Sequence, residues 1–388
     1  MLRVLMSLTL AGAAAVGSTL ASATSYDVLV GTYTQAQSEG LYRLRFDSQT
    51  GQLSSTPAQV VKAHNPSWLT LNKAQTRLFV VNENGPGQKD EVGRVSSYRI
   101  DPASHELTLI NQVETKSHEP THSSLSEDER FLFVANYAVN PQPGGSLAAV
   151  PVSEDGTLGE VAQEKRHNPS KVDPERQASG HVHSAVSNRG YLYVCDLGAD
   201  KVMIYRYQPN AEVPLAPASP ASVDLPPGSG PRHLLFDASG EHAWLTLEMP
   251  AQIASFRWQA GNLVRTDLQD LAPGEKPVKG AAGGLHASAD GRFLYVANRG
   301  SVNELVVYAV NPEGGLKPLQ RRSVEGDHPR EFTLDPTGRF VLVANQKSNE
   351  IVVIERDPKT GLLGRTVQRY KQDSPADLKF LAPAPTAG

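Results

Sequence analysis

Polar and charged side chains recur at one point of a repeated segment. When the chain is aligned on a series of apolar runs, the residues about ten positions before them are Trp68, His122, His183, His233, Gly284, Glu331 and Asp377, with Arg232 and Arg330 directly preceding two of these. An imidazole has a pKa near 6.5 and is suited to proton transfer at neutral pH. A guanidinium offers paired donors that match a carboxylate or a phosphate. These residue types predict acid–base chemistry on an anionic small molecule.

A second polar set stands at the ends of the apolar runs. It consists of Tyr33, Glu83, Tyr137, Leu197, Glu248, Arg299 and Gln346. Burying so much charge in one place costs several kcal/mol unless the groups are paired or hydrated. An anionic ligand would explain the convergence. The alternative is a structural plug, in which salt bridges and water inside the fold satisfy the same groups.

The elements that must position these residues follow from the spacing of the apolar runs. The runs VLVGTY, LFVVNE, LFVANY, LYVCDL, AWLTLE, LYVANR and VLVANQ start at Val28, Leu78, Leu132, Leu192, Ala243, Leu294 and Val341, at intervals of 50, 54, 60, 51, 51 and 47 residues. Each run is too short for a helix and has the composition of a buried strand. A period near 50 residues is typical of propeller blades. The sequence therefore predicts an all-β, seven-bladed β-propeller.

A further strand precedes each run, and its distribution indicates how the ring closes. The segments begin with NPSWLTL at Asn65 and continue to HPREFTL at His328, but none precedes Val28; the seventh copy, SPADLKF, follows the last run at Ser374. The C-terminal strand is therefore predicted to pair with the N-terminal blade, which leaves no unpaired edge. In a propeller the start of the first strand and the end of the second meet at one rim of the channel, so both polar sets are expected there.

The N-terminal residues have the features of a secretory signal. Arg3 is followed by a short apolar run from Val4 to Val16 and by the small residues Ala21, Ser22 and Ala23. The run of about 13 residues is short for a membrane span. We expect residues 1–23 to be a signal peptide, residues 24–388 to form the propeller domain, and the product to be periplasmic or secreted without a membrane span; an N-terminal helix packed on the domain is the alternative.

Composition excludes several classes of protein. The 388 residues are 39% hydrophobic and 20% charged, with 32 Gly and 28 Pro, which argues against a disordered chain or a multi-span membrane protein. A net charge of −4 without blocks of one sign gives no nucleic-acid footprint. The single Cys195 excludes an internal disulfide and is expected to be a buried thiol.

Metal and serine chemistry receive little support. His181 and His183 would face one side of a strand, and a third ligand from His122 or His233 would be needed for a metal. No Gly-x-Ser-x-Gly nucleophile elbow is present. No metal or other cofactor is expected.

The repeats resemble a known family, the seven-bladed propeller lactonases, which includes propeller-type 6-phosphogluconolactonases and carboxymuconate cyclases. The similarity covers nearly the whole chain after residue 23 and is carried by VGTYT at Val30, PTHSSLS at Pro120, HVHSAV at His181, LYVCDLGAD at Leu192, GSGPRHLLF at Gly228, GRFLYVANRG at Gly291 and DHPREFTLDPTGRFVLVANQ at Asp327. The resemblance implies a sugar lactonase of the 6-phosphogluconolactonase type, with a small-molecule lactone or anionic sugar as its partner. The sequence does not identify a protein partner.

The resemblance also implies a catalytic set. It assigns catalysis to His183, Arg232, Glu248 and Arg299; we add His122, His181, His233, His286 and Arg330 as expected substrate contacts. Glu248 or His183 would activate water while the two arginines bind the substrate's anion and the oxyanion. Relatives often carry an acidic residue where this chain has Gly283 and Gly284.

Two other functions stay open. The same residues could serve a cycloisomerase, which opens or closes a lactone ring by proton transfer. A non-catalytic propeller that binds a ligand or protein in the cell envelope is the other possibility, because the fold alone does not establish catalysis. We expect residues 164–179 to form an ordinary loop; a lid or a partner-binding insertion is the alternative.

Overall fold

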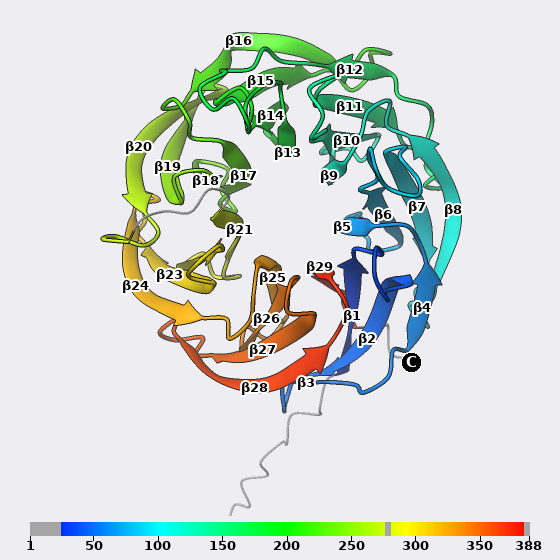
Figure 1. The fold of residues 1–388 in the computed structure, drawn as a ribbon, viewed down its shortest axis with the longest axis vertical. Coiled ribbons are helices and arrows are strands. Elements are labelled where there is room, and N and C mark those ends of the chain that lie inside the picture. The colour runs from blue at the N-terminus through cyan, green and yellow to red at the C-terminus, as the bar shows by residue number, and fades with distance from the viewer. Residues whose placement is uncertain (1–24, 276–280, 384–388) are drawn as a thin grey trace, which may run out of the picture.

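Each apolar run of the repeat forms the second strand of a four-stranded blade. The structure is a computed structural model that describes residues 25–275 and 281–383. The proposed signal peptide lies outside these residues. Within them every regular element is a β-strand, and no helix is long and apolar enough to cross a membrane. Seven sheets surround a central axis, which confirms the predicted propeller (Figure 1).

The blades are numbered in the order of their second strands. Blade 1 consists of β29 (Pro375–Phe380), β1 (Ser25–Thr32), β2 (Gly40–Asp47), β3 (Gln52–Leu53) and β4 (Gln59–Lys62), the last two both pairing with β2. Blades 2 to 4 consist of β5 (Pro66–Leu71), β6 (Arg77–Asn82), β7 (Arg94–Ile100) and β8 (Leu107–Glu114); β9 (Pro120–Leu125), β10 (Phe131–Asn136), β11 (Ser146–Pro151) and β12 (Gln163–Lys165); and β13 (Val182–Asn188), β14 (Tyr191–Asp196), β15 (Lys201–Tyr207) and β16 (Leu215–Asp224). Blades 5 to 7 consist of β17 (Pro231–Phe236), β18 (His242–Leu247), β19 (Gln252–Gln259) and β20 (Asn262–Asp270); β21 (Ala282–Ala287), β22 (Phe293–Asn298), β23 (Glu304–Val310) and β24 (Leu316–Ser323); and β25 (Pro329–Leu334), β26 (Phe340–Asn345), β27 (Glu350–Arg356) and β28 (Leu363–Lys371).

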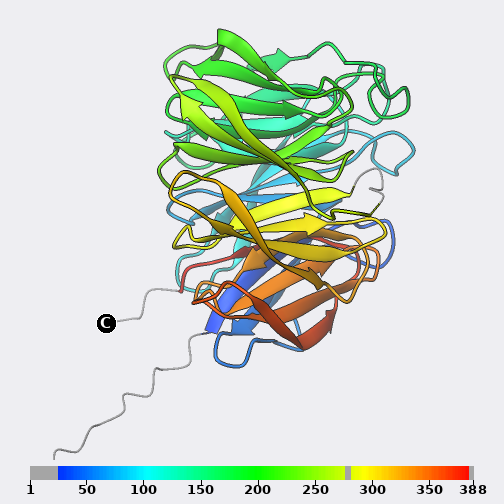
Figure 2. The ribbon, with the colours of Figure 1, turned by 90° about the vertical axis from the view of Figure 1, so that its left-hand side faces the viewer.

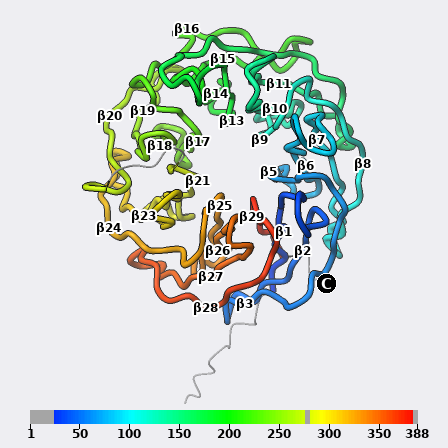
Figure 3. Tube along the Cα trace, in the orientation of Figure 1, coloured from blue at the N-terminus to red at the C-terminus, as the bar shows by residue number. Residues whose placement is uncertain are grey.

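The ring closes as the sequence predicts. The C-terminal strand β29 lies beside β1 as the innermost strand of blade 1, and the two are antiparallel, with Val30 opposite Leu378 (Figure 3). Asp377 of β29 also accepts a hydrogen bond from the Leu69 backbone N–H of blade 2 at 2.8 Å. The two ends of the chain are thereby joined to each other and to the next blade.

The hydrophobic core lies between neighbouring blades. Tyr295 of blade 6, for example, packs with Phe332 and Val343 of blade 7, and all three side chains are buried. Burying a side chain of this size contributes roughly 1.5–3 kcal/mol. Seen from the side, the blades follow one another around the disc (Figure 2). This packing holds the inner strands rigidly around the channel.

The inner strands begin with a recurring irregularity that aims side chains at the rim. Asn65, Glu119, His328 and Ser374 each precede the proline that opens an inner strand, and their φ angles are 41°, 50°, 60° and 40°. A left-handed conformation is uncommon outside glycine and clusters at functional sites. Several inner strands also contain a bulge, as between Val182 and Ser184, which redirects the side chain between them.

Candidate active site

All seven blades contribute to one pocket at the mouth of the channel where the inner strands begin. Its volume is about 340 Å³, and it is lined by Tyr33, Glu83, Gln88, Glu119, Thr121, Tyr137, Val139, Arg176, His183, Glu248, Arg299, His328 and Arg330. Inner-strand starts and second-strand ends meet here, as predicted. The pocket is predominantly polar in its residues, and three arginines and three glutamates face it.

Glu248, which follows β18, is the centre of a buried ionic cluster. Its Oε2 lies 3.0 Å from Arg232 Nε and 3.1 Å from Arg299 Nη2. Its Oε1 lies 2.5 Å from Arg176 Nη2. Although burial opposes ionisation, the arginines hold the pKa of Glu248 far below its usual range. Glu248 is therefore a permanent counter-charge that fixes three guanidinium groups.

His183 completes the predicted catalytic set. Its bulge in β13 places Nε2 4.0 Å from Glu248 Oε2. Burial, followed by the positive charge of Arg232, holds the pKa of His183 well below its ordinary value, so the ring is neutral. Its Nδ1 is buried and has no hydrogen-bond partner among the described residues. The structure thus brings the four predicted residues together, with Arg232 beneath the pocket rather than in its lining.

Arg330 and Tyr33, from blades 7 and 1, form another part of the pocket lining. Arg330 Nη2 lies 3.2 Å from Glu83 Oε2, and its guanidinium carbon lies 5.0 Å from the centre of the Tyr33 ring. The Tyr33 hydroxyl donates to Glu83 at 2.7 Å. Arg330, an expected substrate contact, is therefore in the pocket with its charge already balanced by a carboxylate.

His181 supports the pocket from behind Tyr137. The two rings are stacked with centroids 4.6 Å apart, and His181 Nδ1 lies 2.8 Å from the Tyr137 carbonyl oxygen. The Tyr137 hydroxyl accepts a hydrogen bond from Arg176 at 3.1 Å. His181 does not itself line the pocket. Its contacts orient Tyr137, which does.

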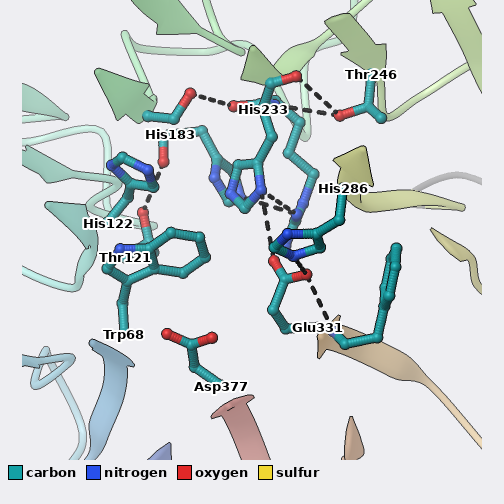
Figure 4. Close-up of polar contacts among 12 residues, drawn as sticks. Trp68, Thr121, His122, His183, His233, Thr246, His286, Glu331 and Asp377 are labelled. Atoms are coloured by element: carbon teal, nitrogen blue, oxygen red, sulfur yellow. Dashed lines mark hydrogen bonds and ion pairs between the residues drawn. The ribbon is translucent and has the colours of Figure 1, made fainter. Parts of the chain in front are cut away.

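The remaining predicted residues lie together in the channel, outside the pocket lining, in what we call the inner channel cluster. Figure 4 shows side chains that converge from different inner strands; the cluster consists of Trp68, His122, His233, His286, Glu331 and Asp377. His122 packs on Trp68 with ring centroids 4.4 Å apart. Glu331 contacts His286 Nε2 at 2.9 Å and His233 Nδ1 at 3.8 Å. His122, His233 and His286 do not line the pocket, so the structure places these expected substrate contacts outside it.

The space beside Gly284, in β21, is occupied by a side chain of the neighbouring blade. A Cβ atom on Gly284 would lie 2.2 Å from Glu331 Oε1. The carboxylate of blade 7 therefore occupies the space that a side chain at Gly284 would need. An acidic group is present at this place in the channel, although it comes from a different strand.

Three of the titratable pocket residues belong to neither of the polar sets predicted from the sequence. Arg176 lies in the loop of residues 164–179, where nothing in the repeat distinguishes it. Glu119 and His328 both precede the proline of an inner strand, and the Xaa-Pro start of those segments was the available signal. Cys195 is buried and burial raises the pKa of its thiol to about 12, as expected of a structural cysteine.

Fold and site together define a closed seven-bladed propeller with an ionic small-molecule pocket at one mouth. Residues 27–380 match the family described as "Lactonase, 7-bladed beta-propeller". The chain belongs to this family.

Relatives of known name cover almost the same length. The chain is similar to the structure of the periplasmic gluconolactonase PpgL of Pseudomonas aeruginosa, with 52% identity, a TM-score of 0.90, and coverage of 93% of this chain and 100% of that one. A structure described as a putative 6-phosphogluconolactonase from Bacteroides fragilis NCTC 9343 has 31% identity, a TM-score of 0.82 and coverage of 92% and 98%. The 6-phosphogluconolactonase of Bacillus subtilis (strain 168) is 32% identical, with 92% of this chain and 99% of the relative covered.

Proposed function

We propose that the protein is a periplasmic lactonase that hydrolyses an unphosphorylated sugar lactone of the gluconolactone type. The observation that carries the choice of substrate is the charge balance of the pocket. The guanidinium groups of Arg176, Arg299 and Arg330 line the pocket together with the three carboxylates Glu83, Glu119 and Glu248, and Arg232 adds a fourth guanidinium beneath the lining. The excess is one positive charge. It suits one developing oxyanion, whereas a phosphate dianion would require further cations.

The ionic cluster supports the chemistry of ester cleavage. Hydrolysis of a lactone develops negative charge on the carbonyl oxygen, and donors that are already oriented lower the barrier most effectively. Arg299 is fixed by Glu248 and by the Ala282 carbonyl, and its Nε has no acceptor among the described residues. In this proposal Arg299 stabilises the oxyanion, Arg232 reinforces its charge from below, and the neutral His183 ring hydrogen-bonds the substrate.

The similar proteins support the same reaction. The PpgL structure, at 52% identity, is named a periplasmic gluconolactonase, whereas the names with 6-phosphogluconolactonase occur at 31% and 32% identity. The predicted signal peptide of residues 1–23 agrees with a periplasmic location. The full-length chain is expressed and the periplasm is released by osmotic shock. Recovery there of a product that begins at Thr24 would support this location, whereas an uncleaved N-terminus in the cytoplasm would contradict it.

The substrate is tested by comparing two lactones. Purified protein beginning at Thr24 is assayed with gluconolactone and with its 6-phosphate, and the spontaneous hydrolysis rate is subtracted. We expect kcat/KM for the uncharged lactone to be greater by at least about tenfold, because the phosphate would have to displace existing ion pairs. The reverse preference contradicts the proposed substrate. Turnover of neither lactone contradicts the proposed reaction on these substrates.

A further inference from the structure

The proton acceptor of the proposed reaction is missing from the predicted set. A water molecule that attacks a carbonyl needs a base within reach, with a pKa suited to accept the proton. Glu248 is held ionised by three arginines, and burial beside Arg232 makes His183 a weak base. Both groups expected to activate water therefore have lowered affinity for a proton.

Glu119 is a pocket carboxylate in a different environment. It directly precedes Pro120 at the start of β9, with a φ of 50°, and its side chain lines the pocket. One carboxylate oxygen accepts a hydrogen bond from the Val139 backbone N–H. A Cβ atom on Gly85 would lie 2.5 Å from Glu119 Cγ, so this glycine leaves the space in which the side chain lies. The position of the carboxylate is thus built by three separate backbone features.

The electrostatic surroundings of Glu119 differ from those of Glu248. No Lys or Arg forms an ion pair with it within the described part of the chain. Burial raises the pKa of its carboxyl, and Glu83 adds to the rise. The Val139 hydrogen bond and His118 act in the opposite direction without cancelling it. Glu119 is consequently a stronger base than Glu248.

The order of blades places this carboxylate across the channel from two arginines. Glu119 belongs to blade 3, whereas Arg299 and Arg330 belong to blades 6 and 7. In a ring of seven, the side opposite blade 3 lies between blades 6 and 7, and Figure 1 shows β9 facing β21 and β25 across the axis. A lactone bound with its carbonyl oxygen at Arg299 would therefore have its carbonyl carbon on the side of the channel that faces Glu119.

We propose that Glu119 is the general base that activates the attacking water, an assignment that rests on the proposed lactonase function. The carboxylate takes a proton from water as the water oxygen forms a bond to the carbonyl carbon, and the carbonyl π electrons move to the oxygen beside Arg299. The tetrahedral intermediate collapses by breaking the bond from carbon to the ring oxygen. Glu119 returns its proton to that oxygen. The new carboxylic acid releases one proton to solvent and leaves as a carboxylate.

The first test compares two isosteric substitutions. Glu119→Gln should lower kcat by roughly 100-fold or more with KM changed less than about threefold, because general base catalysis contributes on that scale. Glu106→Gln, at an exposed glutamate of blade 2 away from the pocket, is the matched control and should keep full activity. Thermal unfolding followed by circular dichroism confirms that both variants are folded.

The second test separates proton transfer from a structural role. Glu119→Ala should regain at least about tenfold in rate on addition of formate, which supplies a replacement carboxylate. For the wild type, kcat/KM should fall as pH drops through the raised pKa of Glu119, and this limb should be absent from the Gln variant. Gly85→Ala should lower kcat although Glu119 itself is unchanged, because the added methyl group displaces the Glu119 side chain.

The outcomes are distinguishable from those that test the proposed function. If the wild type hydrolyses the lactone and Glu119→Gln retains more than about a third of its kcat, this assignment is wrong and the lactonase function stands. Loss of activity in Glu119→Ala without formate rescue, together with an unchanged acid limb in Glu119→Gln, also contradicts it. A wild-type enzyme inactive on both lactones overturns the function and the assignment together.

Discussion

The pocket and the inner channel cluster use the same strands for different purposes. Arg330 and Glu331 are consecutive in β25, yet the first lines the pocket and the second bonds His286 in the channel. Arg176 and Arg330 of the pocket are 26% and 17% exposed and Glu331 is 2% exposed, but Arg299 of the pocket is only 5% exposed and His286 of the channel cluster is 29% exposed. Contact with the pocket, rather than solvent exposure, therefore distinguishes the two sets of side chains.

The two regions also differ in how their buried polar side chains are stabilised. The pocket clusters guanidinium groups around fixed carboxylates, which leaves one positive charge over. The channel cluster instead packs the neutral rings of His122 and His233 against each other and against Trp68, in tilted and edge-on contacts. Burial holds the pKa of His122 at about 3 and that of His233 well below its ordinary value. A site that binds an anion needs excess positive charge, whereas a packed interior accommodates neutral rings.

The largest effect that separates the regions is expected at Arg299. Arg299→Gln should lower kcat by about 10²–10³-fold, because it removes an oriented donor for the oxyanion. Glu248 keeps Arg176 and Arg232 as partners, so the fold should survive. Steady-state kinetics and thermal unfolding check this. Unfolding of the variant at ordinary temperature, or full activity, would favour the structural-plug interpretation of the pocket.

The corresponding change in the channel should affect stability instead. Glu331→Gln should lower the free energy of unfolding by about 1–3 kcal/mol, because it weakens the contacts with His286 and His233. Its kcat should change by less than about threefold. Urea unfolding and the lactone assay measure the two quantities on one preparation. A large loss of kcat at unchanged stability would mean that the two regions are not separate in function.

The pH dependence of stability should sharpen the comparison. His122 is neutral in the folded state down to about pH 3 but is protonated below about pH 6.5 when unfolded, so its contribution to stability is lost as pH falls below 6.5. Each such histidine contributes a slope of about 1.4 kcal/mol per pH unit. His122→Gln should reduce the wild-type slope between pH 6 and pH 4 by about this amount. Urea titrations at several pH values measure it, and an unchanged slope contradicts the buried, neutral state.

The smallest effect is expected at Tyr137. Tyr137→Phe removes the hydroxyl that accepts from Arg176 and should raise KM by about threefold to tenfold, equivalent to the loss of one hydrogen bond. Tyr26→Phe, at the far end of β1 from the pocket, is the matched control and should leave KM unchanged. A change in melting temperature without a change in KM would assign Tyr137 to support rather than to the substrate.

The sequence predicted those parts of the molecule that the repeat governs. The strand that starts at Val28, its partner near Ser374 and the convergence of His183 with Glu248 all follow from one period and from ring closure. Arg176 could not be found this way, because it reaches Glu248 from a non-repetitive loop. The pocket position of Glu119 depends on a left-handed backbone conformation that composition does not reveal.

Side-chain reach limited the prediction at two other places. His122 and His233 occupy the same repeat position as His183, yet of these three only His183 lines the pocket, because strand direction alone does not give the depth at which a side chain ends. The empty position at Gly284 suggested a missing carboxylate. Glu331 fills that space from the adjacent blade, and such an exchange between strands becomes visible only when both backbones are placed.

The pairing of β29 with β1 has a consequence for biosynthesis. A nascent chain that lacks its last dozen or so described residues has six complete sheets and a blade 1 without its innermost strand, β29. Asp377 and its bond to Leu69 of blade 2 are then absent, and blade 1 lacks its innermost strand, although β1 and β2 can still pack against blade 7. Closure of the ring must therefore wait until residues 375–380 have been synthesised, and a chain truncated before Pro375 would be left with an open, protease-sensitive blade 1.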